Sequence, residues 1–168
     1  GELRAGRTVE HELADPHLGR VPRHVGMGPL QPGQHRAVGR QGGARDEVGA
    51  RMRRGLIAVA GSVGANLGFR MLAGTILVFG RSGPNVGMGM RRGTIGVFGT
   101  PRPALFPTFK AGYRGPLPML RMLESQLAGE SFAPEKLSQL AAAVELYHGD
   151  TLQLGRGDLL GVVVDARN

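Results

Sequence analysis

Two arginine pairs occupy the same position in two copies of a repeated sequence. Arg53-Arg54 and Arg91-Arg92 lie 38 residues apart. A guanidinium group binds a carboxylate or phosphate through two parallel hydrogen bonds, so paired arginines suit anionic ligands. Residues 42–99 carry a net charge of +6, whereas residues 100–168 are neutral. The first interpretation of these four arginines is a solvent-exposed corner; the functional interpretations are an anion-binding edge and a contact with a partner subunit.

Phosphate-loop and metal motifs are incomplete in this sequence. Gly87-Met-Gly89 is not part of a Gly-x-Gly-x-x-Gly sequence, and no Gly-Lys-Ser/Thr motif occurs. His11-Glu12 resembles the start of a metalloprotease motif, but Asp15 stands where the second histidine is required. We therefore predict no metal site and no cofactor on this chain.

The remaining polar residues do not form a recognisable catalytic set. Asp150 and Asp158 flank turn sequences, where aspartate commonly hydrogen-bonds to the nearby backbone. Ser62 and Ser82 have no histidine near them in the sequence to activate the hydroxyl group. We therefore predict no catalytic residues.

The composition excludes several classes of protein. The 168 residues include no cysteine, which excludes disulfides, Cys-ligated zinc and Cys-bound iron–sulfur clusters on this chain. Aromatic residues make up 5% and tryptophan is absent, which disfavours a base-stacking surface. The sequence has no apolar run of about 18 residues, as a membrane span requires. We expect no nucleic-acid partner, no membrane partner and a cytoplasmic location.

The arginine pairs belong to a repeated element. The pattern Gly-x-x-Met-x-x-Gly-x-Ile-x-Val-x-Gly starts at Gly49, Gly68 and Gly87, with a spacing of 19 residues and no insertion. Each copy contains a short β-branched run typical of a strand. Four columns of apolar residues are expected to face one interior: Ile57/Ile76/Ile95, Val59/Val78/Val97, Met52/Met71/Met90 and Val48/Leu67/Val86.

A 19-residue unit is too short for a strand–helix–strand crossover with both strands. It suits one coil of a solenoid in which like residues stack about 4.8 Å apart. We predict a right-handed parallel β-helix whose corners are made by glycine, which permits close backbone approach. The predicted corner glycines are Gly42, Gly49, Gly55, Gly61, Gly64, Gly68, Gly74, Gly80, Gly83, Gly87, Gly93 and Gly99.

The flanks of the repeat are predicted to differ from it. Residues 100–168 are expected to form a C-terminal α/β cap and docking region. After a loop through Tyr113, the sequence predicts helices at 117–128 and 135–143 and strands at 144–147, 151–154 and 159–164. Residues 42–99 are the predicted β-helix coils. Residues 1–41 hold four of the five histidines, and we predict a poorly ordered arm or a frame-shifted stretch there.

The repeat and its flank resemble a known family. Gly61-x-x-Gly64-x-x-x-Gly68 is similar to the repeat of the C-terminal domain of glutamate synthase. Met90-Arg-Arg-Gly-Thr-Ile-Gly-Val-Phe-Gly99 more specifically resembles the C-subunit family of formylmethanofuran dehydrogenase and of the bacterial formyltransferase/hydrolase complex. Leu105-Phe-Pro-Thr-Phe-Lys110 and Tyr147-His-Gly-Asp150 resemble the tail of that family. Arg45 departs from the pattern, because the other copies have glycine there.

The resemblance implies a structural component of an oxidoreductase or hydrolase complex that acts on the formyl group of a methanofuran-type coenzyme, in methanogenesis or methylotrophy. Partner subunits would carry molybdenum or tungsten pterin, iron–sulfur and zinc centres. It also implies an acidic coenzyme tail, which the arginine edge could guide. A glutamate-synthase-related domain in ammonia assimilation and a free-standing repeat protein are the alternatives. The sequence does not separate the dehydrogenase setting from the hydrolase setting.

Overall fold

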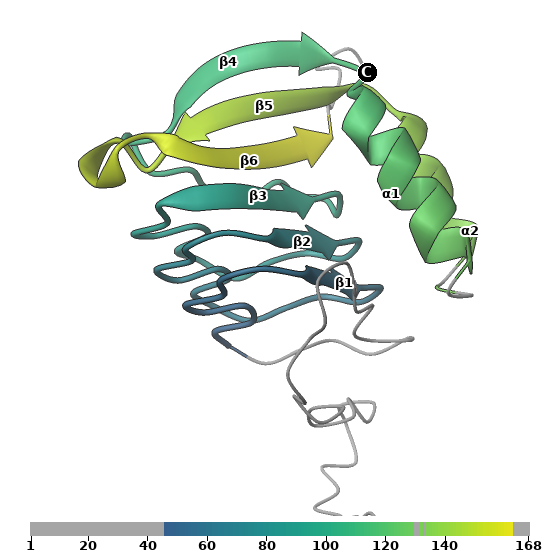
Figure 1. The fold of residues 1–168 in the computed structure, drawn as a ribbon, viewed down its shortest axis with the longest axis horizontal. Coiled ribbons are helices and arrows are strands. Elements are labelled where there is room, and N and C mark those ends of the chain that lie inside the picture. The colour runs from purple at the N-terminus through teal and green to yellow at the C-terminus, as the bar shows by residue number, and fades with distance from the viewer. Residues whose placement is uncertain (1–45, 130–131, 133, 163–168) are drawn as a thin grey trace, which may run out of the picture.

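A computed structural model describes residues 46–129, 132 and 134–162 of the chain. Three short strands from the repeat come first, and two helices and three further strands follow (Figure 1). The elements are β1 (Leu56–Val59), β2 (Thr75–Val78), β3 (Arg92–Val97), β4 (Lys110–Gly115), α1 (Pro118–Gly129), α2 (Pro134–Leu137), the 3-10 helix η1 (Ser138–Ala141), β5 (Val144–Gly149), the 3-10 helix η2 (Thr151–Gln153) and β6 (Arg156–Val162).

The strands form one six-stranded sheet in the order β1-β2-β3-β6-β5-β4. β1, β2, β3 and β6 are parallel neighbours, while β5 pairs antiparallel with both β6 and β4. Within the repeat, Ile57 lies opposite Ile76, and Ile76 lies opposite Ile95. The predicted alignment of the 19-residue copies is therefore confirmed at the level of strand register.

The predicted right-handed parallel β-helix is wrong, because the strands form a single sheet with both parallel and antiparallel pairs. After β3 the chain leaves the 19-residue period, and it returns through the β5–β6 hairpin to place β6 beside β3. A sequence period specifies how neighbouring copies align. It does not specify which strand continues the sheet after the last copy, and here the non-repeating segment supplies it.

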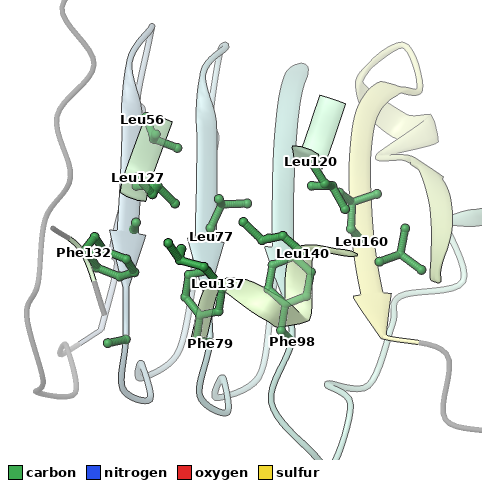
Figure 2. Packing of buried hydrophobic residues seen from close by; sticks show 13 residues of the cluster. Leu56, Leu77, Phe79, Phe98, Leu120, Leu127, Phe132, Leu137, Leu140 and Leu160 are labelled. Atoms are coloured by element: carbon green, nitrogen blue, oxygen red, sulfur yellow. The ribbon is translucent and has the colours of Figure 1, made fainter. Parts of the chain in front are cut away.

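The helices also differ from the predicted terminal cap. α1 and α2 cover one face of the sheet and reach back to its first strand. Leu120 and Leu127 of α1 belong to the same buried cluster as Leu56 of β1 and Leu77 of β2 (Figure 2). The ring centroids of Phe79 and Phe98 lie 5.3 Å apart in this cluster. Burying one apolar face of a sheet against amphipathic helices is a common way to build a core.

The opposite face of the sheet forms a second core. Side chains two apart on a strand point to one face, so the isoleucine and valine columns share this side. The residues that precede each strand in the repeat fold back against it. The cluster contains the four predicted apolar columns, together with Val63, Phe109 and Leu159. All column residues of the second and third copies are buried, whereas in the first copy Val59 is buried and Val48, Met52 and Ile57 are half-buried.

Three local predictions differ from the structure in detail. Residues 110–115 form β4 although five of the six are exposed, because backbone pairing with β5 makes the strand without an apolar pattern. The predicted strand at 151–154 is η2, which Asp150 caps through its side chain. The predicted helix at 135–143 is divided between α2 and η1. The division of the chain into three parts stays a prediction, and residues 1–41 lie outside the described residues.

Candidate functional site

The arginine pairs lie where the parallel strands begin. Arg53 and Arg54 precede β1, whereas Arg91 immediately precedes β3 and Arg92 is its first residue. Parallel strands start at the same edge of a sheet, so the two pairs share one edge, about 10 Å apart at the usual strand spacing. All four residues are exposed. The anion-binding role predicted for them stays a prediction.

A fifth arginine, Arg156, lies at the same edge of the sheet as the two arginine pairs. Arg156 is the first residue of β6, and its Cα pairs in register with that of Arg92. Adjacent strands are about 4.8 Å apart, so these two exposed arginines are immediate neighbours. The sequence analysis missed Arg156 because it lies outside the repeat. A weak signal existed in Arg156-Gly-Asp, which matches Arg92-Gly-Thr of the last copy.

We call Arg53, Arg54, Arg91, Arg92 and Arg156 the arginine rim. Within the described residues, no ion pair involves a rim arginine. The acids nearest to Arg156 in the sequence have other partners. Asp158 lies 2.8 Å from His148, measured from Oδ1 to Nδ1, and Asp150 is buried and accepts backbone hydrogen bonds. The rim therefore presents uncompensated positive charge to solvent.

The backbone behind the rim is layered. The Leu72 and Arg91 amides donate to the carbonyls of Met52 and Met71, in both cases at 2.8 Å. These bonds stack each turn on the preceding turn, so the rim is carried by regular, hydrogen-bonded backbone. Asp150 extends the stack, because its Oδ2 accepts a hydrogen bond from the Gly89 amide at 3.2 Å.

The predicted corner glycines that the structure describes lie at turns or at close backbone approaches. A Cβ on Gly74 would lie 3.0 Å from the Gly55 carbonyl oxygen, at a residue whose φ is +112°. Gly42 lies outside the described residues. A positive φ occurs at Gly49, Gly55, Gly68, Gly74, Gly87 and Gly93, whereas a Cβ on Gly80, Gly83 or Gly99 would meet the backbone of Gly61, Gly64 or Gly80 respectively.

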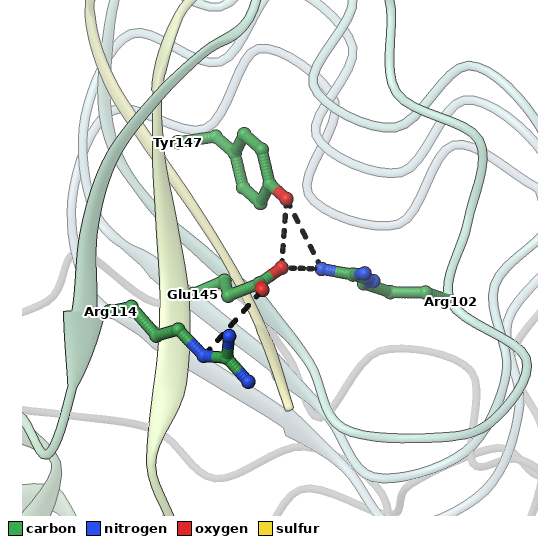
Figure 3. A network of polar contacts seen from close by, with 4 residues as sticks. All are labelled: Arg102, Arg114, Glu145 and Tyr147. Carbon is green, nitrogen blue, oxygen red and sulfur yellow. Dashed lines mark hydrogen bonds and ion pairs between the residues drawn. The ribbon is translucent and has the colours of Figure 1, made fainter. Parts of the chain in front are cut away.

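A second polar cluster lies away from the rim, around Glu145 of β5 (Figure 3). The Tyr147 hydroxyl donates to Glu145 Oε2 at 2.8 Å, and Arg102 Nη1 forms an ion pair with the same oxygen. Arg102 Nη1 also donates to the Tyr147 hydroxyl oxygen at 3.2 Å, and Arg114 Nε lies 3.9 Å from Glu145 Oε1. No sequence pattern marked Arg102 or Glu145 as partners, because 43 positions separate them.

The electrostatics of this cluster keep its groups in fixed protonation states. Hydrogen bonds from Tyr147 and Arg102 lower the pKa of the Glu145 carboxyl group. Burial and the hydrogen bond to Glu145 raise the pKa of Tyr147, and Glu145 raises the pKa of Arg102. A general acid or base works best with a pKa near the operating pH. The cluster is therefore better suited to linking the chain around Arg102 to strand β5 than to transferring a proton.

Asp150 caps η2, which confirms its predicted role at a turn. His11 and Glu12 lie outside the described residues. Among residues 46–129, 132 and 134–162, no three His, Cys, Asp or Glu side chains gather as a metal-ion site. No helix in that part of the chain is long and apolar enough to cross a membrane.

A comparison with solved structures finds a related chain. It belongs to the formyltransferase/hydrolase complex (FhcABCD) from Methylorubrum extorquens, whose crystal structure was determined in complex with methylofuran. The two chains are 36% identical, with a TM-score of 0.65. The match covers 76% of this chain and 46% of that chain, so this chain spans about half the length of its relative. No family model and no curated protein matches the sequence.

This chain is therefore similar to a component of a methylofuran-containing complex. A sequence identity of 36% is higher than that of chains that share only a fold. It agrees with the coarser part of the family prediction, a relationship to the formyltransferase/hydrolase complex.

Proposed function

We propose that the chain is a non-catalytic structural component, of the C-subunit type, in a formyltransferase/hydrolase-like complex. The observation that carries the proposal is the 36% identity over 76% of the chain to a component of the M. extorquens complex. In this role the chain helps to organise an assembly that acts on the formyl group of a methylofuran-type coenzyme. Any metal or pterin centres of the assembly belong to other subunits.

The arrangement of the described residues supports a structural role. Both faces of the sheet carry extensive buried clusters, one of them covered by α1 and α2. In the Glu145 cluster, the carboxylate of Glu145 is bonded to Arg102 and Tyr147 within the same chain. The arginine rim remains exposed and is available for contacts with other molecules. The similarity to a hydrolase complex favours that setting over a dehydrogenase, and no observation here favours a glutamate synthase or a free-standing protein.

Copurification from the native host tests this proposal. We expect the affinity-tagged full chain to bring down the other subunits in fixed stoichiometry, as measured by native mass spectrometry. We also expect deletion of its gene to reduce formyl transfer to the methylofuran-type coenzyme, and expression of the chain to restore it. Recovery of the chain alone, together with unchanged formyl transfer in the deletion strain, would contradict the proposal.

A further inference from the structure

Two leucines stand out on the surface next to the arginine rim. Leu152 is 77% exposed and Leu154 is 76% exposed, and both belong to the short connection between β5 and β6. Single exposed apolar residues are common on protein surfaces. Here two large ones lie on one short loop, and neither belongs to a buried cluster of the described residues.

The loop that carries the leucines is held firmly. Asp150, which is 5% exposed, accepts hydrogen bonds from the Leu152 amide at 3.0 Å and from the Gly89 amide at 3.2 Å. Its carbonyl oxygen accepts from the Gln153 and Gly155 amides at 2.8 and 2.9 Å. The leucines are therefore presented by an ordered turn, and binding through them costs little additional conformational entropy.

The same loop adjoins the positive charge of the rim. Arg156 follows Leu154 by two residues, and its Cα pairs in register with that of Arg92. The hydrogen bond from Gly89 to Asp150 fixes the loop against the turn that leads into Arg91. In Figure 1 the loop projects from the edge of the sheet where β3 and β6 begin. The leucines and three rim arginines therefore form one surface.

We propose that this surface, Leu152 and Leu154 with Arg91, Arg92 and Arg156, docks an acidic protein partner whose apolar pocket receives the two leucines. Arginines at an interface pair with carboxylates, and burying the leucines supplies the apolar centre that strong interfaces share. A nucleic acid or an anionic coenzyme tail would neutralise the arginines but would leave the leucines in water. The inference rests on the proposed function, because it names where another member of that assembly binds.

The test compares three forms of the full chain, each coexpressed with the other subunits in the native host. They are the wild type, Leu152→Ser/Leu154→Ser, and Arg91→Gln/Arg92→Gln/Arg156→Gln. We expect each variant to weaken incorporation by more than about tenfold, as residues at an interface centre do. Incorporation of the wild type should fall as salt increases, and the arginine variant should show a smaller salt dependence. Native mass spectrometry at two ionic strengths measures both effects.

Matched substitutions away from the surface serve as controls. Met119→Ser/Met122→Ser removes exposed apolar side chains from α1, and Arg81→Gln removes an exposed arginine from the turn after β2. Both should assemble normally, and all variants should keep the wild-type melting temperature because the changed side chains are exposed.

The outcomes separate the two proposals. If the wild type is not recovered with the other subunits, the proposed function fails and the docking surface fails with it. If the wild type assembles and the leucine variant assembles equally well, the docking surface alone is overturned. If the leucine variant fails but the arginine variant is normal, the acidic partner is overturned. A raised KM for the coenzyme in a normally assembled arginine variant would assign the rim to the anionic coenzyme tail instead.

Discussion

At the scale of single residues, the repeat depends on positions where a side chain does not fit. Gly99 lies at the end of the third copy, where an added Cβ would overlap the carbonyl group of Gly80. Neither partner can yield without moving hydrogen-bonded backbone. The absence of a side chain is therefore a packing requirement at this position.

Gly99→Ala is expected to lower the free energy of unfolding by about 1–3 kcal/mol, the usual range for overpacking. Gly129→Ala is the matched control, since a Cβ there meets nothing within 4 Å. We expect it to leave stability unchanged or slightly raised. Thermal and denaturant unfolding of the assembled protein measure both variants, and equal stability of the two would contradict the close approach at Gly99.

Glu145→Gln tests the polar cluster through its pH dependence. Because the native pKa of Glu145 is lowered, the carboxylate stabilises the fold above its ordinary pKa of 4.5 and loses that contribution as pH falls through the native value. We expect the variant to lose about 1–2 kcal/mol at pH 7. The difference from the wild type should shrink toward pH 3.

The control for this substitution is Glu135→Gln, at an exposed residue of α2. Because this side chain is exposed, the substitution should leave the melting temperature close to that of the wild type. Melting temperatures between pH 3 and pH 8 provide the comparison, and a constant difference between Glu145→Gln and the wild type would show that the ionised cluster does not stabilise the fold.

At the scale of elements, the turns of the repeat are joined by side chains as well as by backbone. Asn85 Nδ2 donates to Asn66 Oδ1 at 3.0 Å, across the 19-residue period. Both residues have a positive φ, 66° and 61° respectively, which asparagine tolerates better than most residues. The asparagine column thus contributes both a turn conformation and a hydrogen bond between turns.

Substitution of Asn85 can separate these two contributions. Asn85→Ala loses the hydrogen bond and places alanine at a positive φ, so we expect a cost of about 2 kcal/mol. Asn85→Gly loses only the hydrogen bond, and we expect about half that cost. Equal unfolding free energies for the two variants, measured by denaturant titration, would mean that the turn conformation stores no strain.

At the scale of the whole molecule, the two outer strands of the sheet differ. β4 contains a bulge and two charged residues, Lys110 and Arg114, whereas β1 reads Leu-Ile-Ala-Val. Among the described residues, β1 has no neighbour on its outer side. Natural proteins blunt exposed strand edges with charges and bulges, because a flat apolar edge pairs with other chains.

We therefore expect the full chain to aggregate when it is expressed alone and to remain dispersed when its partner subunits are coexpressed. Light scattering and gel filtration of the two preparations measure the difference. If the chain expressed alone gives a monodisperse monomer that melts cooperatively, the β1 edge does not pair with other chains.

The sequence alone determined the features that depend on local repetition. Like residues at a 19-residue spacing place Ile57, Ile76 and Ile95 side by side, because only that register puts one apolar column on one face. The leucine spacing of the 117–128 segment predicted α1 to within one residue at each end. The repeat and its flank also pointed to a relationship with the formyltransferase/hydrolase complex, which contains the similar chain.

Only the tertiary structure decided how the repeat ends. The pairing of β6 with β3 joins residues about 64 positions apart and brings Arg156 to Arg92. β4 has no apolar pattern of its own and forms a strand because β5 supplies its hydrogen-bond partners. A one-dimensional pattern records local propensity and periodicity, but these pairings are chosen by the burial and hydrogen bonding of the whole chain. For that reason the β-helix prediction failed, whereas the predicted register was confirmed.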